Sequence, residues 1–159
     1  MKFGGVASSG KVPVFIYIFF LVHMLAFGGS GFFMAYSEPD PPVDFLFMHG
    51  GFAIFIYLIF YLVIFGLDEV KWIFINAFLG LFGIIVEIDW ILSLYDRKLS
   101  DFPVYVHIIP FLYYILYTFL IRRALIDFTG SWNNAQRKKR VEIGYIVVSI
   151  IIYLGFYFA

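Results

Sequence analysis

The sequence predicts an all-α integral membrane protein, folded as a single bundle of five transmembrane helices with the N-terminus in the cytoplasm and the C-terminus outside. Of the 159 residues, 63% are hydrophobic and 14% are charged, whereas soluble domains average about 25% charged residues. The apolar residues gather in long uncharged runs, and short polar connections separate the runs. Helices joined in this way pack as antiparallel neighbours, so residues 1–159 are expected to form one domain.

Five spans follow from the uncharged runs, taken in order. About 20 apolar residues in a helix, each rising ~1.5 Å, cross a hydrocarbon core about 30 Å thick. The first, second and fourth runs reach this length directly, the third reaches it only by continuing through Glu87 and Asp89, and the fifth is shorter. The runs are continuous, whereas a membrane strand would alternate apolar and polar residues over about 10 positions. The expected spans are residues 12–34, 45–67, 72–95, 103–126 and 141–159.

The distribution of basic residues predicts the orientation of these spans. Cytoplasmic segments of membrane proteins carry an excess of Lys and Arg. With five crossings, only Arg97 and Lys98 lie on the outer side. The other nine basic residues lie on the side of the N-terminus: Lys2, Lys11, Lys71, Arg122, Arg123, Arg137, Lys138, Lys139 and Arg140. The split predicts a cytoplasmic N-terminus and leaves the kind of membrane open.

A basic run formed by Arg137, Lys138, Lys139 and Arg140 precedes the fifth span. Basic residues near a membrane surface attract anionic lipid at about 1 kcal/mol per charge. The same residues determine which side of the membrane a loop occupies. We therefore expect the run to set the topology or to contact anionic lipid.

Composition also excludes nucleic-acid binding and any site built on cysteine. Lys plus Arg and Asp plus Glu both number 11, so the chain lacks the positive net charge that a nucleic-acid-binding surface needs. The chain contains no Cys, so it has neither a disulfide framework nor a thiolate metal site. The lipid bilayer is the first partner that the composition predicts.

Five ionisable side chains lie well inside the predicted spans: His23, His49, Glu87, Asp89 and His107. A charged Asp at the centre of a membrane costs roughly 2.5–3.5 kcal/mol on insertion scales, so each such residue needs a partner or a function. Counted from the helix ends, His49 and His107 lie at equal depth, about 6 Å from the outer side, with both carboxylates in the same layer. His23 lies deeper. Imidazole and carboxylate groups at one depth predict a site for a transition metal, a haem or a small ligand.

A second pattern in the third span predicts close helix packing. Asn76, Gly80, Gly83 and Glu87 recur at i, i+4, i+7 and i+11, which places them on one helix face. Small residues let neighbouring helix backbones approach closely in a membrane. We expect this face to pack against another helix, with Glu87 buried in it.

The sequence leaves three functions open. The first is a membrane site near the outer leaflet, formed by His49, His107 and Glu87 or Asp89 with His23 deeper, that binds haem, a metal or a small ligand and transfers electrons or protons. The second is a non-catalytic accessory or assembly subunit, joined to other membrane subunits or to further copies of this chain. The third is a small transporter, although the unequal spans contain no inverted repeat. The chain carries no signature of a catalytic nucleophile, and enzymatic activity stays open.

Overall fold

The structure is a computed structural model that describes residues 12–37 and 41–158, and every regular element in these residues is a helix. Five helical segments are long and apolar enough to cross a membrane. The predictions of an all-α fold and of five membrane-spanning helices are thereby confirmed. The long apolar helices indicate an integral membrane protein in contact with the lipid bilayer.

The five spans contain six α-helices and one of the two 3₁₀ turns that precede α5. The long helices are α1 (Val14–Tyr36), α2 (Val43–Phe65), α4 (Trp72–Ser93), α5 (Ile108–Phe128) and α6 (Ala135–Phe158). A single turn, α3 (Leu67–Val70), precedes α4 within the third span, and two 3₁₀ turns, η2 (Leu99–Asp101) and η3 (Val104–His107), lead into α5.

Local sequence explains where several helices begin and end. Gly66 separates α2 from α3 with φ 83°, a conformation that a residue with a side chain rarely adopts. Pro110 lies in the first turn of α5, where its missing N–H removes no helical hydrogen bond. The last helix begins at Ala135, before the apolar run that starts near residue 141. Its start is determined by Asn134, whose side-chain oxygen accepts a hydrogen bond of 2.9 Å from the Arg137 N–H.

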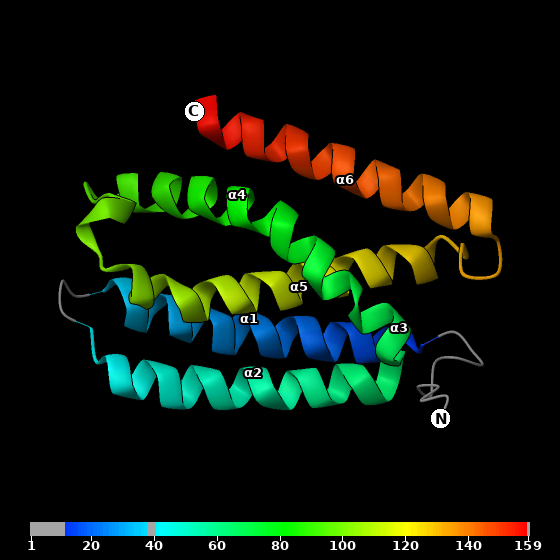
Figure 1. The fold of residues 1–159 in the computed structure, drawn as a ribbon, viewed down its shortest axis with the longest axis horizontal. Coiled ribbons are helices and arrows are strands. Elements are labelled where there is room, and N and C mark those ends of the chain that lie inside the picture. The colour runs from blue at the N-terminus through cyan, green and yellow to red at the C-terminus, as the bar shows by residue number, and fades with distance from the viewer. Residues whose placement is uncertain (1–11, 38–40, 159) are drawn as a thin grey trace.

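Helix α5 occupies the centre of the bundle. Figure 1 shows it between α1 and α4, with α2 beyond α1 and α6 outermost beside α4. Helix α6 contacts both α4 and α5. Half of the most apolar stretch of the α5 span is buried, against 6% for α6. Helix α6 is therefore the most lipid-exposed span, and α5 supplies the largest part of the core.

The helices alternate in direction, which gives the bundle two distinct ends (Figure 1). We call the end at which α1, α4 and α6 begin and α2 and α5 finish the basal end. The opposite end, where α1 and α4 finish and η3 leads into α5, is the distal end. The sequence-based orientation would place the basal end in the cytoplasm.

Small residues of α4 permit close contact with two tyrosine rings. A Cβ atom added at Gly80 would lie 3.3 Å from the Tyr114 ring of α5, and one added at Gly83 would overlap the Tyr153 ring of α6. The two tyrosine hydroxyls form a hydrogen bond of 2.8 Å with each other. Asn76, one turn below Gly80, is also buried. This face of α4 packs against α5 and α6 together.

A methyl group at Gly83 tests this contact. Gly83→Ala should lower the melting temperature of the purified protein in detergent, because overpacking costs typically about 1–3 kcal/mol. Gly144→Ala on α6 is the matched control, since the space around its Cβ is open and Ala favours a helix by about 1 kcal/mol over Gly. Equal melting temperatures for the two variants would contradict the contact between α4 and Tyr153.

Candidate functional site

The first two histidines face the apolar surroundings of α1 and α2. His23 is exposed, and its ring stacks on Phe27 with the ring centroids 5.4 Å apart. His49 is half-buried and stacks on Phe27 at 5.6 Å and on Phe45 at 5.7 Å. Both imidazoles therefore form part of a row of aromatic rings on this side of the bundle.

The other three predicted residues lie around α4 and the distal end. His107 forms a hydrogen bond of 2.8 Å between its Nδ1 and the Tyr36 hydroxyl. Asp89 is exposed and accepts a hydrogen bond of 3.0 Å from the Leu99 N–H. Asp89 and His107 line one cavity of about 770 Å³, together with Lys98, whereas Glu87 lines a different one.

The five predicted residues are thus divided among three places. Among residues 12–37 and 41–158, the structure contains no group of three or more His, Asp or Glu side chains that could hold a metal ion. The geometry of these side chains gives no support to a metal or haem site. It does associate Glu87 with a more promising feature, a cleft between α1 and α4.

The cleft exists because α1 and α4 both pack on α5 without packing along each other. Between them lies a cavity of about 260 Å³ with almost entirely apolar walls. Gly28 and Gly29 of α1 form part of its wall, and a Cβ added at Gly29 would meet open space. The floor consists of α5 side chains, among them Tyr113, Tyr114 and Tyr117. We call this space the inner cavity.

Four side chains with polar groups line the inner cavity: Glu87, Tyr113, Tyr114 and Tyr117. Tyr114 donates its hydroxyl hydrogen to Tyr153. Tyr113 is 5% exposed, and its hydroxyl has no hydrogen-bond partner within the described part of the chain. A buried hydroxyl without a partner costs about 1–3 kcal/mol. The Tyr113 hydroxyl oxygen has almost no accessible surface, so it does not open into the inner cavity.

A second cavity continues the cleft toward the distal end. It has a volume of about 500 Å³ and includes Tyr36, Tyr95 and Arg97 in its lining. Phe32 of α1 and Ile91 of α4 line both this cavity and the inner cavity. We call it the outer cavity, and the two adjoin at these residues.

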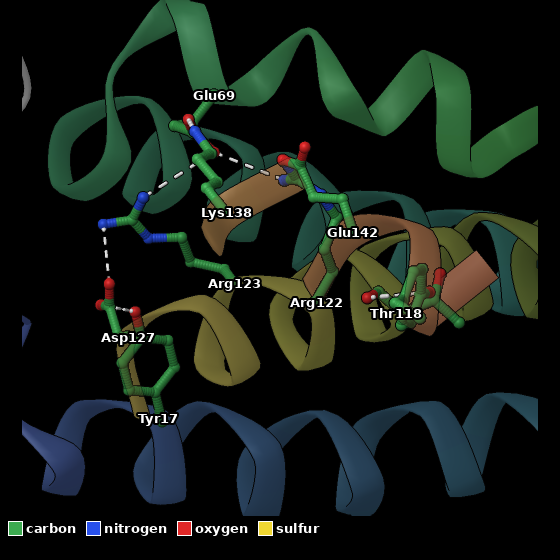
Figure 2. Close-up of polar contacts among 9 residues, drawn as sticks. Tyr17, Glu69, Thr118, Arg122, Arg123, Asp127, Lys138 and Glu142 are labelled. Carbon is green, nitrogen blue, oxygen red and sulfur yellow. Dashed lines mark hydrogen bonds and ion pairs between the residues drawn. The ribbon is translucent and has the colours of Figure 1, made fainter. Parts of the chain in front are cut away.

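The basal end is closed by a buried cluster of charges (Figure 2). Its centre is Glu69 of α3, whose carboxylate lies 2.8 Å from Lys138 Nζ, 3.4 Å from Arg122 and 3.7 Å from Arg123. Arg122 also pairs with Glu142 of α6. Three cations thus meet three carboxylates, because Asp127 completes the set through Arg123 at 3.3 Å.

Aromatic and hydroxyl groups complete this basal cluster. Arg122 lies 3.7 Å above the ring of Trp72, and Arg123 lies 3.7 Å above the ring of Trp132. Such cation–π contacts stabilise a guanidinium that has lost water. Tyr17 of α1 donates a hydrogen bond to Asp127. The Arg123 guanidinium has ion-pair partners but no hydrogen bond of good geometry within the described residues.

The cluster joins α1, α3, α5 and α6 at one end of the bundle. Arg122, Arg123 and Asp127 are each at most 1% exposed. From the sequence, the two arginines are expected to be topology charges, and their burial is not predicted. One signal was available, since Arg123 and Asp127 stand at i and i+4 on one helix, but the partners Glu69 and Glu142 are remote in sequence.

The basic run before the last span is divided by the structure. Lys138 points inward to Glu69. Arg137, Lys139 and Arg140 are exposed at the start of α6. These three side chains remain available to lipid headgroups or to solvent at the basal end.

Comparison with protein-family models, with curated proteins and with solved structures finds no match for this chain.

Neutralising Glu69 tests the basal cluster. Glu69→Gln leaves three cations with two carboxylates, and breaking a buried ion pair costs on the order of 3–5 kcal/mol. We expect a large loss of stability in detergent, measured by thermal unfolding. Asp68→Asn is the control, because the side chain of Asp68 is 97% exposed and exposed ion pairs contribute about 0–1 kcal/mol. Similar losses in both variants would show that Glu69 is not a buried centre of charge.

Proposed function

We propose that this protein binds a small lipophilic molecule in the cleft between α1 and α4. The observation that carries the proposal is the inner cavity itself, whose walls are almost entirely apolar and whose lining includes the half-buried Glu87 side chain. Ligand sites combine apolar walls with a few polar groups that orient the ligand. The inner cavity has this composition, with Glu87, Tyr114 and Tyr117 among the residues that line its otherwise apolar walls.

The proposal takes the small-ligand form of the function expected from the sequence. A ligand would enter from the bilayer, because α1 and α4 leave the cleft open along a side that no other span covers. A polar group on the ligand would bond to Glu87, which lines the inner cavity. Of the residues singled out in the sequence, Glu87 is the one that belongs to this site.

We further propose that the basal end lies in the cytoplasm and the distal end outside. The exposed cations Lys71, Arg137, Lys139 and Arg140 support this orientation, because they all lie at the basal end. The distal end carries Arg97 and Lys98 alone among the described basic residues. The cleft then opens toward the outer leaflet.

Filling the inner cavity tests ligand binding. Gly29→Leu should fit without a clash, because the Cβ position is open, and should occupy the space that a ligand needs. We expect the protein purified in mild detergent to carry a stoichiometric lipophilic molecule, detected by native mass spectrometry. The variant should lose at least about ten-fold of that occupancy, equivalent to about 1.4 kcal/mol.

The matched control is Gly51→Leu on α2. Its Cβ position is also open, and Gly51 is not among the residues that line the inner or the outer cavity. Occupancy should stay at the wild-type level in this variant. Equal occupancy in wild type and Gly29→Leu would refute the proposed site.

Single cysteines test the orientation, and the absence of native Cys makes the assay clean. Ser100→Cys places a thiol at the distal end and Asn133→Cys places one at the basal end, both at exposed positions. In intact cells, a membrane-impermeant maleimide should label the Ser100 variant only. Labelling of the Asn133 variant without permeabilisation would reverse the proposed orientation.

A further inference from the structure

Arg97 occupies an unusual position for a cation at the distal end. The chain reverses after α4 at Asp96, which has φ 57°, and this turn directs the Arg97 side chain back toward α1. Its Nη1 donates hydrogen bonds of 2.7 Å to the Tyr36 carbonyl and 3.1 Å to the Ser37 carbonyl. These carbonyls belong to the C-terminal end of α1, so Arg97 bridges the two walls of the cleft.

The guanidinium of Arg97 has more hydrogen-bond donors than its bonds to the two carbonyls use. A guanidinium has five N–H groups, and the bonds to the two carbonyls use only those on Nη1. Among the described residues, no carboxylate forms an ion pair with Arg97. The side chain is half-buried and lines the outer cavity. Within residues 12–37 and 41–158, its Nε and Nη2 form no hydrogen bond, and this pair of donors has the forked geometry that binds an oxyanion.

We propose that the outer cavity binds the oxyanion headgroup of a lipid, with Arg97 as the residue that recognises the charge. The inference rests on the proposed function, because the hydrocarbon part of the same molecule would occupy the apolar inner cavity. The two cavities adjoin at Phe32 and Ile91. A single amphipathic molecule could place its acidic head beside Arg97 in the outer cavity and its apolar body in the inner cavity.

The polarity of the cleft supports a lipid over a water-soluble anion. The outer cavity has Phe32, Phe33, Ile91 and Leu92 beside its one cation, so a free phosphate ion would leave most of the lining without a partner. A phosphate or carboxylate attached to an acyl or isoprenoid chain satisfies both the guanidinium and the apolar walls. The headgroup would also contact Tyr36, whose hydroxyl is already bonded to His107.

The test compares three probes on the purified full chain in an uncharged detergent. Phosphatidic acid carries the oxyanion head, a diacylglycerol with the same acyl chains lacks it, and inorganic phosphate lacks the chains. We expect the wild type to bind phosphatidic acid at least about ten-fold more tightly than the diacylglycerol and to bind inorganic phosphate far more weakly than either. Inorganic phosphate binding as tightly as phosphatidic acid would overturn the assignment to a lipid.

Two variants assign the preference to Arg97. Arg97→Gln should remove most of the preference for phosphatidic acid while leaving diacylglycerol binding within about two-fold. Lys98→Gln is the control, because Lys98 is the neighbouring cation but lines the cavity beside His107 instead, and the preference should be unchanged. An unchanged preference in Arg97→Gln, or its loss in Lys98→Gln, would overturn the inference.

Photochemical labelling of the wild type keeps the inference testable if Arg97→Gln does not fold. A phosphatidic acid probe with a photoreactive group beside its phosphate should label peptides that contain residues 32–37 and 91–97. Labelling confined to the basic start of α6 would overturn the headgroup site.

The outcomes separate the two proposals. If Gly29→Leu abolishes binding of both lipids but Arg97→Gln changes nothing, the lipophilic site stands and the headgroup assignment fails. If neither lipid binds the wild type, the headgroup assignment fails, and the lipophilic site is decided separately by the occupancy of wild type and Gly29→Leu in native mass spectrometry.

Discussion

The structure depends on charge balance inside the basal end of the bundle. Arg122, Arg123 and Lys138 meet Glu69, Asp127 and Glu142 in a space from which lipid and most water are excluded. Each charge alone would be costly to bury, and only a complete set with good partners offsets that cost. Because its members come from α3, α5 and α6, with Tyr17 added from α1, the cluster holds these helices together at one end.

No comparable set of ion pairs joins the described helices at the distal end. There the connections are the hydrogen bonds of Arg97 to the end of α1 and of Tyr36 to His107. Helix α5 lies between its neighbours, so α1 and α4 are both held against it yet remain apart. The result is a bundle that is joined at its basal end and open along one side. Within the cleft, Glu87 lines the inner cavity and Arg97 lines the outer cavity, nearer the distal end.

Much of the fold could be predicted from the sequence, because uncharged length and polar connections follow directly from the cost of burying polar groups in lipid. The placement of the site was harder to predict. Helix position predicts that His49 and His107 lie at one depth, but it does not give the direction in which each helix turns its side chains. In the structure His49 stacks on Phe45 and Phe27, whereas His107 bonds to Tyr36. Their shared depth therefore does not bring them together.

Two further features depend on tertiary contacts that single-helix patterns do not contain. From the sequence, Arg122 and Arg123 are expected to lie at the membrane interface. Their burial is explained only by their pairing with Glu69 and Glu142, which are distant in sequence. In the sequence, Tyr113 is one of many aromatic residues. Only the separation of α1 from α4 in the structure shows that it lines a cavity.

The central claim is that the cleft between α1 and α4 is a ligand site and not a gap that closes in the membrane. An experimental density map of the protein in lipid nanodiscs tests it most directly. The account predicts elongated non-protein density that begins beside Glu87, passes Phe32 and Ile91, and ends at the Arg97 guanidinium. Direct packing of α1 against α4 along this path, with no density between them, would contradict it.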